Sequence, residues 1–316
     1  MTESGNPDSK QLGNSAARLR LASNSNHEAR PRLRLAIQKE GRLTDQTLGI
    51  LHSIGLDFDS YKQKLFSNCR NFELDILYSR DDDIPEYIAS GTADLGVVGQ
   101  NLIYEESVDV TELLPIGFGH CTLVVAVPKD SGLNDVQQLN GLKIATSYPK
   151  SARKFLDSRG VQAEIITLSG AVELAPNLGL AHAIIEITAT GSSLVLNDLV
   201  AIQDIIKSEA VLAVNRDSLA HPYKSRNIER LLTRMQAALA AKKYKYIVMN
   251  APRKKLDSII AVVPGLKSPT IVPLADPDWV AVHTVVQEDT FWDVMEQLKA
   301  AGAGGILVVP IEKMLL

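Results

Sequence analysis

The chain has 316 residues, which is enough for two or three domains. Its composition, 45% hydrophobic and 22% charged, is typical of a globular protein, and a formal net charge of −4 offers no basic surface for nucleic acid. The two cysteines, Cys69 and Cys121, are too few for a disulfide scaffold or a Cys-based metal site. No apolar run approaches the roughly 18 residues of a membrane span. We therefore expect neither a nucleic-acid partner nor a membrane.

The first 30 residues differ from the rest of the chain. They are rich in Ser, Asn and Arg and lack the apolar segment of a secretory signal. Glu3, Asp8 and Glu28 argue against a transit peptide, which is poor in acidic residues. Residues 1–30 are predicted to be a disordered tail, and the protein is expected to be cytoplasmic.

Residues 32–37 are predicted to form a strand, which a five-residue loop joins to a helix. Thr44 is expected to cap this helix, which runs to about residue 54. The loop places Lys39 and Arg42 beyond the carboxyl end of a strand, where α/β sheets bind ligands. Two cations there suit a polyphosphate. Solvated surface charges are the alternative interpretation.

A second strand is predicted over residues 74–78, and a helix over about 86–90. Arg80 and three consecutive aspartates, residues 81–83, lie between them. Consecutive carboxylates do not converge on one metal ion without a special loop, and Asp83 can simply cap the helix. Arg80 is the better ligand candidate.

The next segments predict two lobes. Residues 91–99 form a glycine-rich turn, a buried strand and a final glycine, a pattern that also occurs in two-lobed solute-binding folds. A strongly apolar strand over 121–127 marks the entry into a second lobe, and apolar residues near 210 mark the return. The predicted boundaries are 31–126 with 210–235 for the first lobe, and 127–209 for the second.

Residues 173–194 carry the clearest chemical pattern of the chain. Glu173 lies on a helix-like run, Glu186 lies in an apolar strand, and the sequence Thr190-Gly191-Ser192-Ser193 follows. A strand, a hydroxyl-rich turn and a helix start present N–H groups and hydroxyls to an anion. Glu186 can then reach the hydroxyls of a sugar whose phosphate sits in the turn. The alternative is a strand and an N-capped helix with no ligand.

The last part of the chain predicts a separate domain. A helix with a 3.6-residue apolar period covers residues 226–242. Strand and helix signals then alternate as β-α-β-β-α-β from residue 246 to 309, the ferredoxin-like order. Residues 240–316 are predicted to form this domain, which by its fold alone has no fixed function.

Taken together, these segments resemble the long form of the ATP phosphoribosyltransferase family, the first enzyme of histidine biosynthesis. The resemblance extends over residues 32–314. Besides the segment with Glu173 and Glu186, the matching pieces are Gln-Lys-Glu-Gly-Arg-Leu at 38–43, Arg-Asp-Asp-Asp-Ile-Pro at 80–85, Ala-Asp-Leu-Gly at 93–96, Ile-Ala-Thr-Ser-Tyr-Pro at 144–149, Pro-Gly-Leu-Lys-Ser-Pro-Thr at 264–270 and Pro-Ile-Glu-Lys-Met at 310–314. Their order makes the resemblance far more specific than any one motif.

The resemblance implies an α/β fold: a two-lobed, periplasmic-binding-protein-like catalytic core plus a C-terminal ferredoxin-like regulatory domain. It implies the transfer of a phosphoribosyl group from phosphoribosyl pyrophosphate to N1 of ATP, with Mg²⁺ as cofactor and no identified metal ligands. Glu173 and Glu186 would hold the ribose hydroxyls. Thr190, Gly191, Ser192 and Ser193 would hold the 5-phosphate, and the residues expected around the nucleotide and pyrophosphate are Lys39, Arg42, Arg80, Asp94, Leu95 and Tyr148.

The resemblance also implies regulation and assembly. Histidine would bind the C-terminal domain as feedback inhibitor, AMP is a possible second inhibitor, and the chain would form a homo-oligomer between dimer and hexamer. The residues that match the histidine pocket by position are Asn250, Leu266, Ser268, Thr270, Val285 and Gly305.

Four residues depart from the family pattern. Glu186 stands where the family usually has Asp, Ser193 where it has Thr, His182 where most members carry Asp, and Thr122 where many have Arg. His182 and Thr122 favour an alternative function, a non-catalytic two-lobed sensor with an effector domain. The retained carboxylates and hydroxyl-rich turn favour the enzyme.

Overall fold

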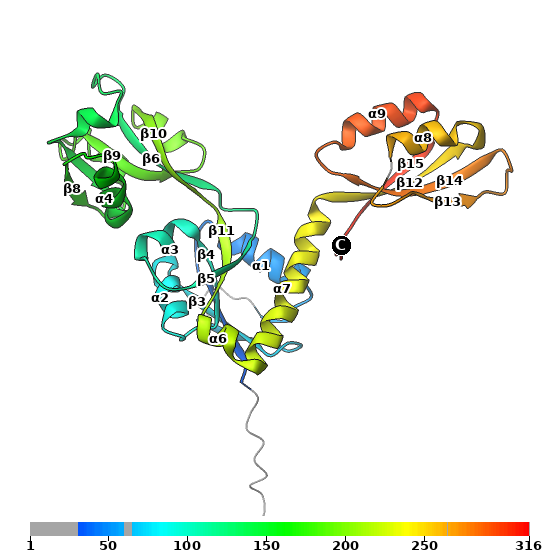
Figure 1. Ribbon diagram of the computed structural model, residues 1–316, viewed down its shortest axis with the longest axis horizontal. Coiled ribbons are helices and arrows are strands. Elements are labelled where there is room, and N and C mark those ends of the chain that lie inside the picture. The colour runs from blue at the N-terminus through cyan, green and yellow to red at the C-terminus, as the bar shows by residue number, and fades with distance from the viewer. Residues whose placement is uncertain (1–30, 60–64, 264, 316) are drawn as a thin grey trace, which may run out of the picture.

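The computed structural model describes residues 31–59, 65–263 and 265–315. Its strands form three sheets of six, five and four strands. Figure 1 shows two α/β lobes side by side and a third unit that the long helix α7 carries away from them. The disordered tail predicted for residues 1–30 lies outside the described residues. Within the described residues, no helix is long and apolar enough to span a membrane.

The first lobe is built on the six-stranded sheet, with strand order β2-β3-β1-β4-β11-β5. Its strands are β1 (Leu33–Gln38), β2 (Phe66–Asn68), β3 (Leu74–Ser79), β4 (Leu95–Gly99), β5 (Thr111–Pro115) and β11 (Ala210–Val214). Its helices are α1 (Thr44–Ser53), α2 (Ile84–Ala89), α3 (Gln100–Glu106), α6 (Arg216–Ala220) and α7 (Pro222–Lys242). Because β1, β3 and β4 are parallel, their carboxyl ends meet at one edge.

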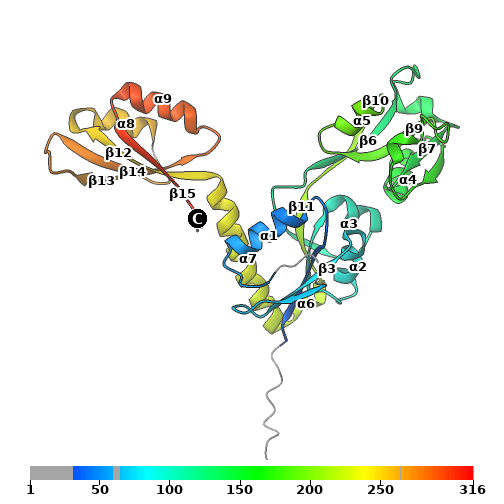
Figure 2. The ribbon, with the colours of Figure 1, turned by 180° about the vertical axis from the view of Figure 1, so that it is seen from behind.

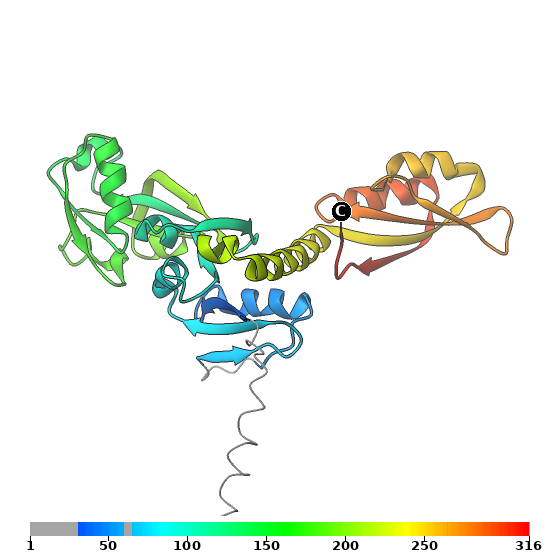
Figure 3. The same cartoon turned by 60° about the horizontal axis from the view of Figure 1, so that its bottom comes forward.

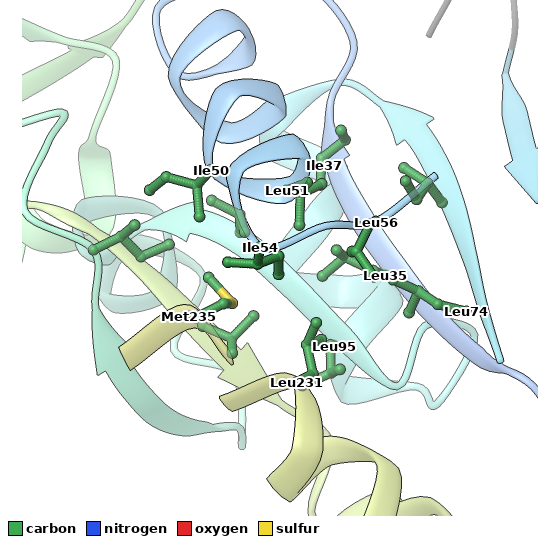
Figure 4. Close-up of a cluster of buried hydrophobic side chains, with 14 of the residues drawn as sticks. Leu35, Ile37, Ile50, Leu51, Ile54, Leu56, Leu74, Leu95, Leu231 and Met235 are labelled. Atoms are coloured by element: carbon green, nitrogen blue, oxygen red, sulfur yellow. The ribbon is translucent and has the colours of Figure 1, made fainter. Parts of the chain in front are cut away.

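The core of this lobe explains why α1 and α7 lie on the same face of the sheet. Leu51 of α1 and Leu231 and Met235 of α7 pack with Leu35 and Leu74 of the sheet (Figure 4). Leu35, Leu51, Leu74 and Leu231 are fully buried. These side chains recur at helical spacing on α7, so the predicted apolar period of this helix is confirmed.

The second lobe is built on the five-stranded sheet, with strand order β10-β6-β9-β7-β8. Its elements are β6 (Cys121–Pro128), β7 (Lys143–Thr146), α4 (Pro149–Ser158), β8 (Glu164–Thr167), β9 (Ala183–Thr188), α5 (Ser192–Leu196) and β10 (Leu199–Ser208), with single 3-10 turns at Val136–Leu139 and Val172–Leu174. Each lobe thus has its own sheet, as the sequence predicts.

One predicted boundary is wrong. The sequence assigned residues up to 126 to the first lobe, but β6 pairs along its whole length with β10, from Cys121 with Ser208 to Pro128 with Leu199. The chain therefore crosses between residues 115 and 121 and returns at Glu209, between β10 and β11. An apolar strand can belong to either sheet, so its composition did not reveal its partner.

The two predicted cap residues make no capping hydrogen bond with their side chains. The cap position of α1 is Leu43, and Thr44 is the first helical residue, whose hydroxyl donates to the Gln38 carbonyl at 3.2 Å. Asp83 does occupy the cap position of α2, but its side chain makes no capping hydrogen bond, because residues 81–83 already form a helical turn. Both helices nevertheless occur where the sequence predicts them.

The C-terminal unit has the predicted ferredoxin-like topology. Its sheet has the order β13-β14-β12-β15, and two helices cover one face. The elements are β12 (Tyr244–Pro252), α8 (Leu256–Val262), β13 (Thr270–Pro273), β14 (Trp279–Gln287), α9 (Phe291–Ala301) and β15 (Gly304–Pro310). Figures 2 and 3 show this unit on the opposite side of the first lobe from the second lobe. The Met314 N–H returns to the carbonyl of Ala237 on α7 at 3.0 Å.

A buried ionic network fixes α7, and hence the C-terminal unit, to the first lobe. Asp94 is 2% exposed. Its carboxylate accepts hydrogen bonds from the Arg34 N–H at 2.8 Å, the Ser218 hydroxyl at 2.5 Å and the Lys224 ammonium at 2.6 Å. Nearby, Tyr223 donates to Glu73 on the loop before β3. All three partners of Asp94 are therefore lost if its carboxylate is removed.

We expect Asp94→Ala to destabilise the two lobes by about 3 kcal/mol, because it leaves a mostly buried ammonium without its counter-ion. Chemical denaturation followed by circular dichroism measures the effect. Both tryptophans, Trp279 and Trp292, lie in the C-terminal unit, so their fluorescence reports that unit separately.

The matched control is Asp198→Asn. Asp198 pairs with Lys129 at 3.2 Å on the surface, with its side chain 83% exposed, and Asn tolerates its positive φ of 55°. This variant should cost less than about 1 kcal/mol. Equal losses for the two variants would show that the Asp94 network does not stabilise the lobes.

Candidate functional site

The carboxyl edge of the first sheet brings two of the predicted cations to one cavity. Lys39 follows β1, Arg80 follows β3, and the Lys39 N–H donates to the Ser79 carbonyl at 2.8 Å. A cavity of about 700 Å³ opens here, lined by Lys39, Glu40, Leu65, Leu77, Tyr78, Ser79, Arg80, Asp81, Asp83, Tyr87 and Thr92. Arg42 lies in the same loop outside this lining. Among the described residues, the buried Ser79 hydroxyl has no hydrogen-bond partner. The cavity thus offers two cations to an anionic ligand.

The structure does not bring Asp94 and Leu95 to this edge. Leu95 pairs with Leu35 near the amino end of β1 and is fully buried in the core. Asp94 is five positions before Gly99, or roughly 16 Å along the strand, and all of its contacts are internal. The prediction of these two residues near the nucleotide is therefore not supported by their placement. Their motif is explained by packing and by the network with Lys224.

In the second lobe, Glu186 lies near the carboxyl end of β9 and is 8% exposed. Its two oxygens accept hydrogen bonds from the Ser147 N–H at 3.1 Å and the Ile187 N–H at 3.0 Å. Burial raises the pKa of the Glu186 carboxyl above its ordinary value, the two backbone bonds oppose this rise, and the charge of Glu173 adds to it. The charges of Glu173 and Glu186 thus influence each other.

Tyr148 lies where the two lobes meet. It precedes α4 in the second lobe, and its hydroxyl accepts a hydrogen bond from the Asn101 amide of α3, in the first lobe, at 3.2 Å. Burial, followed by the nearby charge of Glu186, raises the pKa of the Tyr148 hydroxyl far above its ordinary value. Tyr148 therefore stays neutral, and it connects the neighbourhood of Glu186 to the first lobe.

The predicted hydroxyl-rich turn follows β9. Gly191 has a φ of +77°, its N–H donates to the Thr188 hydroxyl at 2.9 Å, and the hydroxyls of Thr190 and Ser192 lie 2.8 Å apart. Ser193 lies in the first turn of α5. Strand, turn and helix start are confirmed, and the turn lies at the same end of β9 as Glu186. A carboxylate and a cluster of hydroxyls thus share one end of the second sheet.

Sequence reasoning missed the residues that join the lobes. Cys121 of β6 lies beside Ser208 of β10 within the second lobe, 3.2 Å from its hydroxyl oxygen, and its sulfur lies 4.0 Å from the Asn101 amide oxygen of the first lobe. Asn101 and Glu105 of α3 contact the second lobe directly. Asn101 could have been found, because it follows the carboxyl end of a parallel strand as Lys39 does. Nothing in the sequence pairs Cys121 with Ser208.

The two most unusual residues lie in different places. His182 lies at the amino end of β9, far from the turn, and its Nδ1 accepts the Lys143 N–H at 3.1 Å. Thr122 pairs with Thr188 and Lys207 and lines a cavity of about 250 Å³ with His120 and Ala189. Only Thr122 is therefore near the hydroxyl-rich turn.

A resident metal would have few protein ligands. Among the described residues, no group of three or more His, Cys, Asp or Glu side chains could hold an ion. Mg²⁺ needs no such group, because it commonly binds one or two carboxylates together with substrate phosphates and water. Asp81 and Asp83 line the cavity with Lys39 and Arg80, so their carboxylates suit this kind of site.

The predicted effector residues fall only partly together. Asn250, Thr270 and Val285 project from the sheet face opposite α8 and α9, since their alternating neighbours Ile247, Val280 and Val282 pack in the core beneath the helices. Gly305 has a φ of +57°, and a Cβ there would lie 3.3 Å from the Asn250 amide. Leu266 and Ser268 are exposed in the loop before β13. Val285 pairs with Tyr246, four residues along β12 from Asn250.

Glu186→Gln should change the pH dependence of stability. The folded pKa of Glu186 is raised, so folding favours the protonated carboxyl, and its stabilising effect is lost as pH rises through the raised pKa. The melting temperature of Glu186→Gln relative to wild type should therefore increase between about pH 4 and pH 8. Glu229→Gln, at an exposed position of α7, is the control. A flat or falling difference for Glu186→Gln would contradict this account.

Comparisons with known proteins agree with this geometry. A family model described as ATP phosphoribosyltransferase matches residues 80–237, and one described as HisG, C-terminal domain, matches residues 241–313. ATP phosphoribosyltransferase of Bacteroides thetaiotaomicron is 45% identical over 284 residues, which cover 90% of this chain and all of the relative. That of Cytophaga hutchinsonii is 42% identical over 281 residues, 89% of this chain and 98% of the relative.

A solved structure is also similar. The structure described as the ATP phosphoribosyl transferase (HisG:HisZ) complex from Thermotoga maritima matches with a TM-score of 0.58 and 28% identity, covering 65% of this chain and 96% of that chain. Similarity over this much of both sequences and of the fold leaves one conclusion. The chain belongs to the ATP phosphoribosyltransferase family and includes that family's C-terminal domain.

Proposed function

We propose that the site lies between the two lobes and transfers the 5-phosphoribosyl group of phosphoribosyl pyrophosphate to N1 of ATP. As a family member, the chain is a pentosyltransferase of histidine biosynthesis. The observation that carries the assignment is the position of Tyr148, which connects the end of the second sheet that holds Glu186 to α3, at the carboxyl edge of the first sheet. Two half-sites thus face one junction.

The sugar half would lie in the second lobe. Glu186 and Glu173 would accept hydrogen bonds from the ribose hydroxyls, and the turn from Thr190 to Ser193 would donate to the 5-phosphate. Charge-assisted bonds from hydroxyls to a carboxylate are about twice as strong as neutral ones. The raised pKa of Glu186 supports this assignment, because hydroxyl donors would compensate for the burial that disfavours its charge.

The nucleotide half would lie in the first lobe. Lys39 and Arg80 line a cavity that suits a polyphosphate, and Arg42 lies in the loop beside it. Mg²⁺, when bound with pyrophosphate, would supply positive charge, and Asp81 and Asp83 are the carboxylates placed to hold it. Asp94 and Leu95 are left out of this half because they lie in the interior of the lobe.

The proposed reaction needs no covalent bond between the protein and a substrate. The N1 lone pair forms the bond to C1 of the ribose, and the C1–O bond breaks with its electron pair leaving on pyrophosphate. The barrier is then lowered by orientation and by charge stabilisation around an oxocarbenium-like centre. Burial of Tyr148 and Glu186 would keep water from C1.

The C-terminal unit would bind histidine as a feedback inhibitor. The polar groups of Asn250 and Thr270 on the sheet face opposite α8 and α9 support this proposal, and Ser268 lies in the adjoining loop. Inhibition would pass along α7, which the Asp94 network fixes to the first lobe, and by linkage histidine would weaken productive substrate binding. The T. maritima relative is a complex, which supports assembly into an oligomer.

The reaction is tested by mixing the protein with ATP, phosphoribosyl pyrophosphate and Mg²⁺, and following pyrophosphate release and the product mass. We expect turnover by the wild type and a loss of about tenfold or more in kcat for Glu186→Gln, because a charged hydrogen-bond acceptor is removed. Glu229→Gln should behave as wild type. Unchanged kinetics for Glu186→Gln would remove its ribose assignment. No product from the wild type would favour a non-catalytic binding protein.

Histidine binding is tested by calorimetry on the full chain. We expect Asn250→Asp to bind histidine about fivefold more tightly than wild type, because an amide is replaced by a charged acceptor for the ligand's ammonium or imidazolium. Gln287→Glu adds the same charge at the far end of β14 and should not have this effect. If neither the wild type nor either variant binds histidine, the regulatory proposal is refuted and the catalytic one is unaffected.

A further inference from the structure

A buried carboxylate of the first lobe caps a helix of the second. Glu105, near the end of α3, is 5% exposed. Its Oε1 accepts the Lys150 N–H and its Oε2 accepts the Ser151 N–H, both at 2.8 Å. These N–H groups lie in the first turn of α4, where a helix has no internal acceptors. Tyr148, at the cap position of α4, gives no side-chain capping bond, so Glu105 supplies the cap from the other lobe.

The hydrogen bonds of Glu105 to the first turn of α4 are strong and directional. Both carboxylate oxygens are used, the acceptor is charged, and it faces the positive end of the α4 dipole. The neighbouring pair of Glu106 with Lys150 is also short, at 2.6 Å, but its side chains are 41% and 56% exposed. Exposed pairs contribute little. Glu105 therefore gives α3 a buried, charged contact with the first turn of α4.

The capped segment is also the one that reaches the proposed site. Ser147 and Tyr148 directly precede α4, the Ser147 N–H binds Glu186, and the Tyr148 hydroxyl binds Asn101. Residues 147–151 are thus held by Glu105 and Asn101 of the first lobe and by Glu186 of the second. A shift of α4 along α3 would move Ser147, and with it one of the two donors that orient Glu186.

The covalent connections between the lobes do not prevent a shift of α4 along α3. The lobes are joined by residues 116–120 and by Glu209, which is two short crossings. Such crossings permit hinge motion, and a few element-terminal residues can absorb it. Apolar contacts of α3, such as those of Leu102 and Ile103, help to hold the lobes but do not fix a direction as hydrogen bonds do.

We propose that Glu105 is a positioning residue that holds the two half-sites at the spacing and orientation needed for the attack of N1 on C1. It touches no substrate. It acts through the first turn of α4 on Ser147, and through Ser147 on Glu186. The proposal rests on the site assignment above, in which the lobes bind different substrates.

The first arm of the test does not depend on activity. Hydrogen exchange on the full chain, read by mass spectrometry, should show faster exchange of residues 147–156 in Glu105→Gln, because Gln keeps only one acceptor oxygen. Exchange in residues 244–310 should not change. Glu106→Gln, which removes only the exposed pair, should exchange as wild type. Unchanged protection of α4 in Glu105→Gln would show that Glu105 does not hold α4 in place, whatever reaction the enzyme catalyses, and would overturn the proposal.

The second arm measures kinetics on folded protein. We expect kcat of Glu105→Gln to fall about tenfold or more, with the Kd for ATP within about twofold of wild type, because the first-lobe half-site is intact. Glu106→Gln should keep wild-type kcat. A residue with a merely structural role would lower the melting temperature and leave kcat per folded molecule unchanged, and this result would overturn the proposal.

A double-mutant cycle shows whether Glu105 acts through Glu186. If it does, Glu105→Gln should cost much less in kcat/KM in the Glu186→Gln background than in wild type. Full additivity of the two losses would mean independent effects and would contradict the path through Ser147. If α4 of Glu105→Gln loses protection but the wild type shows no turnover, Glu105 still holds α4 in place, and the proposed reaction is refuted instead.

Discussion

The geometry of this protein depends on contacts across the junction between its two sheets. The chain crosses the junction only at residues 116–120 and 209, so the covalent structure does not set how the lobes face each other. Side chains from α3 do so: Asn101 binds Tyr148, and Glu105 binds the start of α4. The carboxyl edge of the first sheet and the end of the second sheet with Glu186 are consequently held toward the same junction. A transferase that joins two substrates needs such an arrangement.

Three buried carboxylates show how differently the fold uses charge. Asp94 is balanced by the Lys224 ammonium and stabilises the position of α7. Glu105 is balanced by the N-terminus of a helix in the other lobe. Among the residues that the structure describes, Glu186 has two backbone donors but no cation, and burial outweighs the donors, so the pKa of its carboxyl is raised. A charge that the protein alone satisfies poorly is a mark of a functional position, which distinguishes Glu186 from the other two.

Much of this could be predicted from the sequence. The periodic helix α7, the β-α-β-β-α-β order and the strand–turn–helix after Glu186 follow from apolar spacing and turn residues, and the structure has each of them. Asp94 and Leu95 were assigned to the nucleotide from the resemblance alone, and the structure puts them at the start of β4, away from the cavity with Lys39 and Arg80. The assignment of β6 failed since pairing is non-local. The role of Glu105 could not be predicted, because a capping residue that comes from another lobe leaves no pattern in the sequence near the helix.

The central claim is that the sugar phosphate binds in the second lobe and the nucleotide in the first. A crystal structure of the protein with phosphoribosyl pyrophosphate and Mg²⁺ tests it most directly. The account predicts the 5-phosphate against the turn from Thr190 to Ser193, with ribose hydroxyls within hydrogen-bond distance of Glu186. A sugar phosphate bound instead in the cavity of Lys39 and Arg80, with Glu186 making no contact to it, would contradict the account.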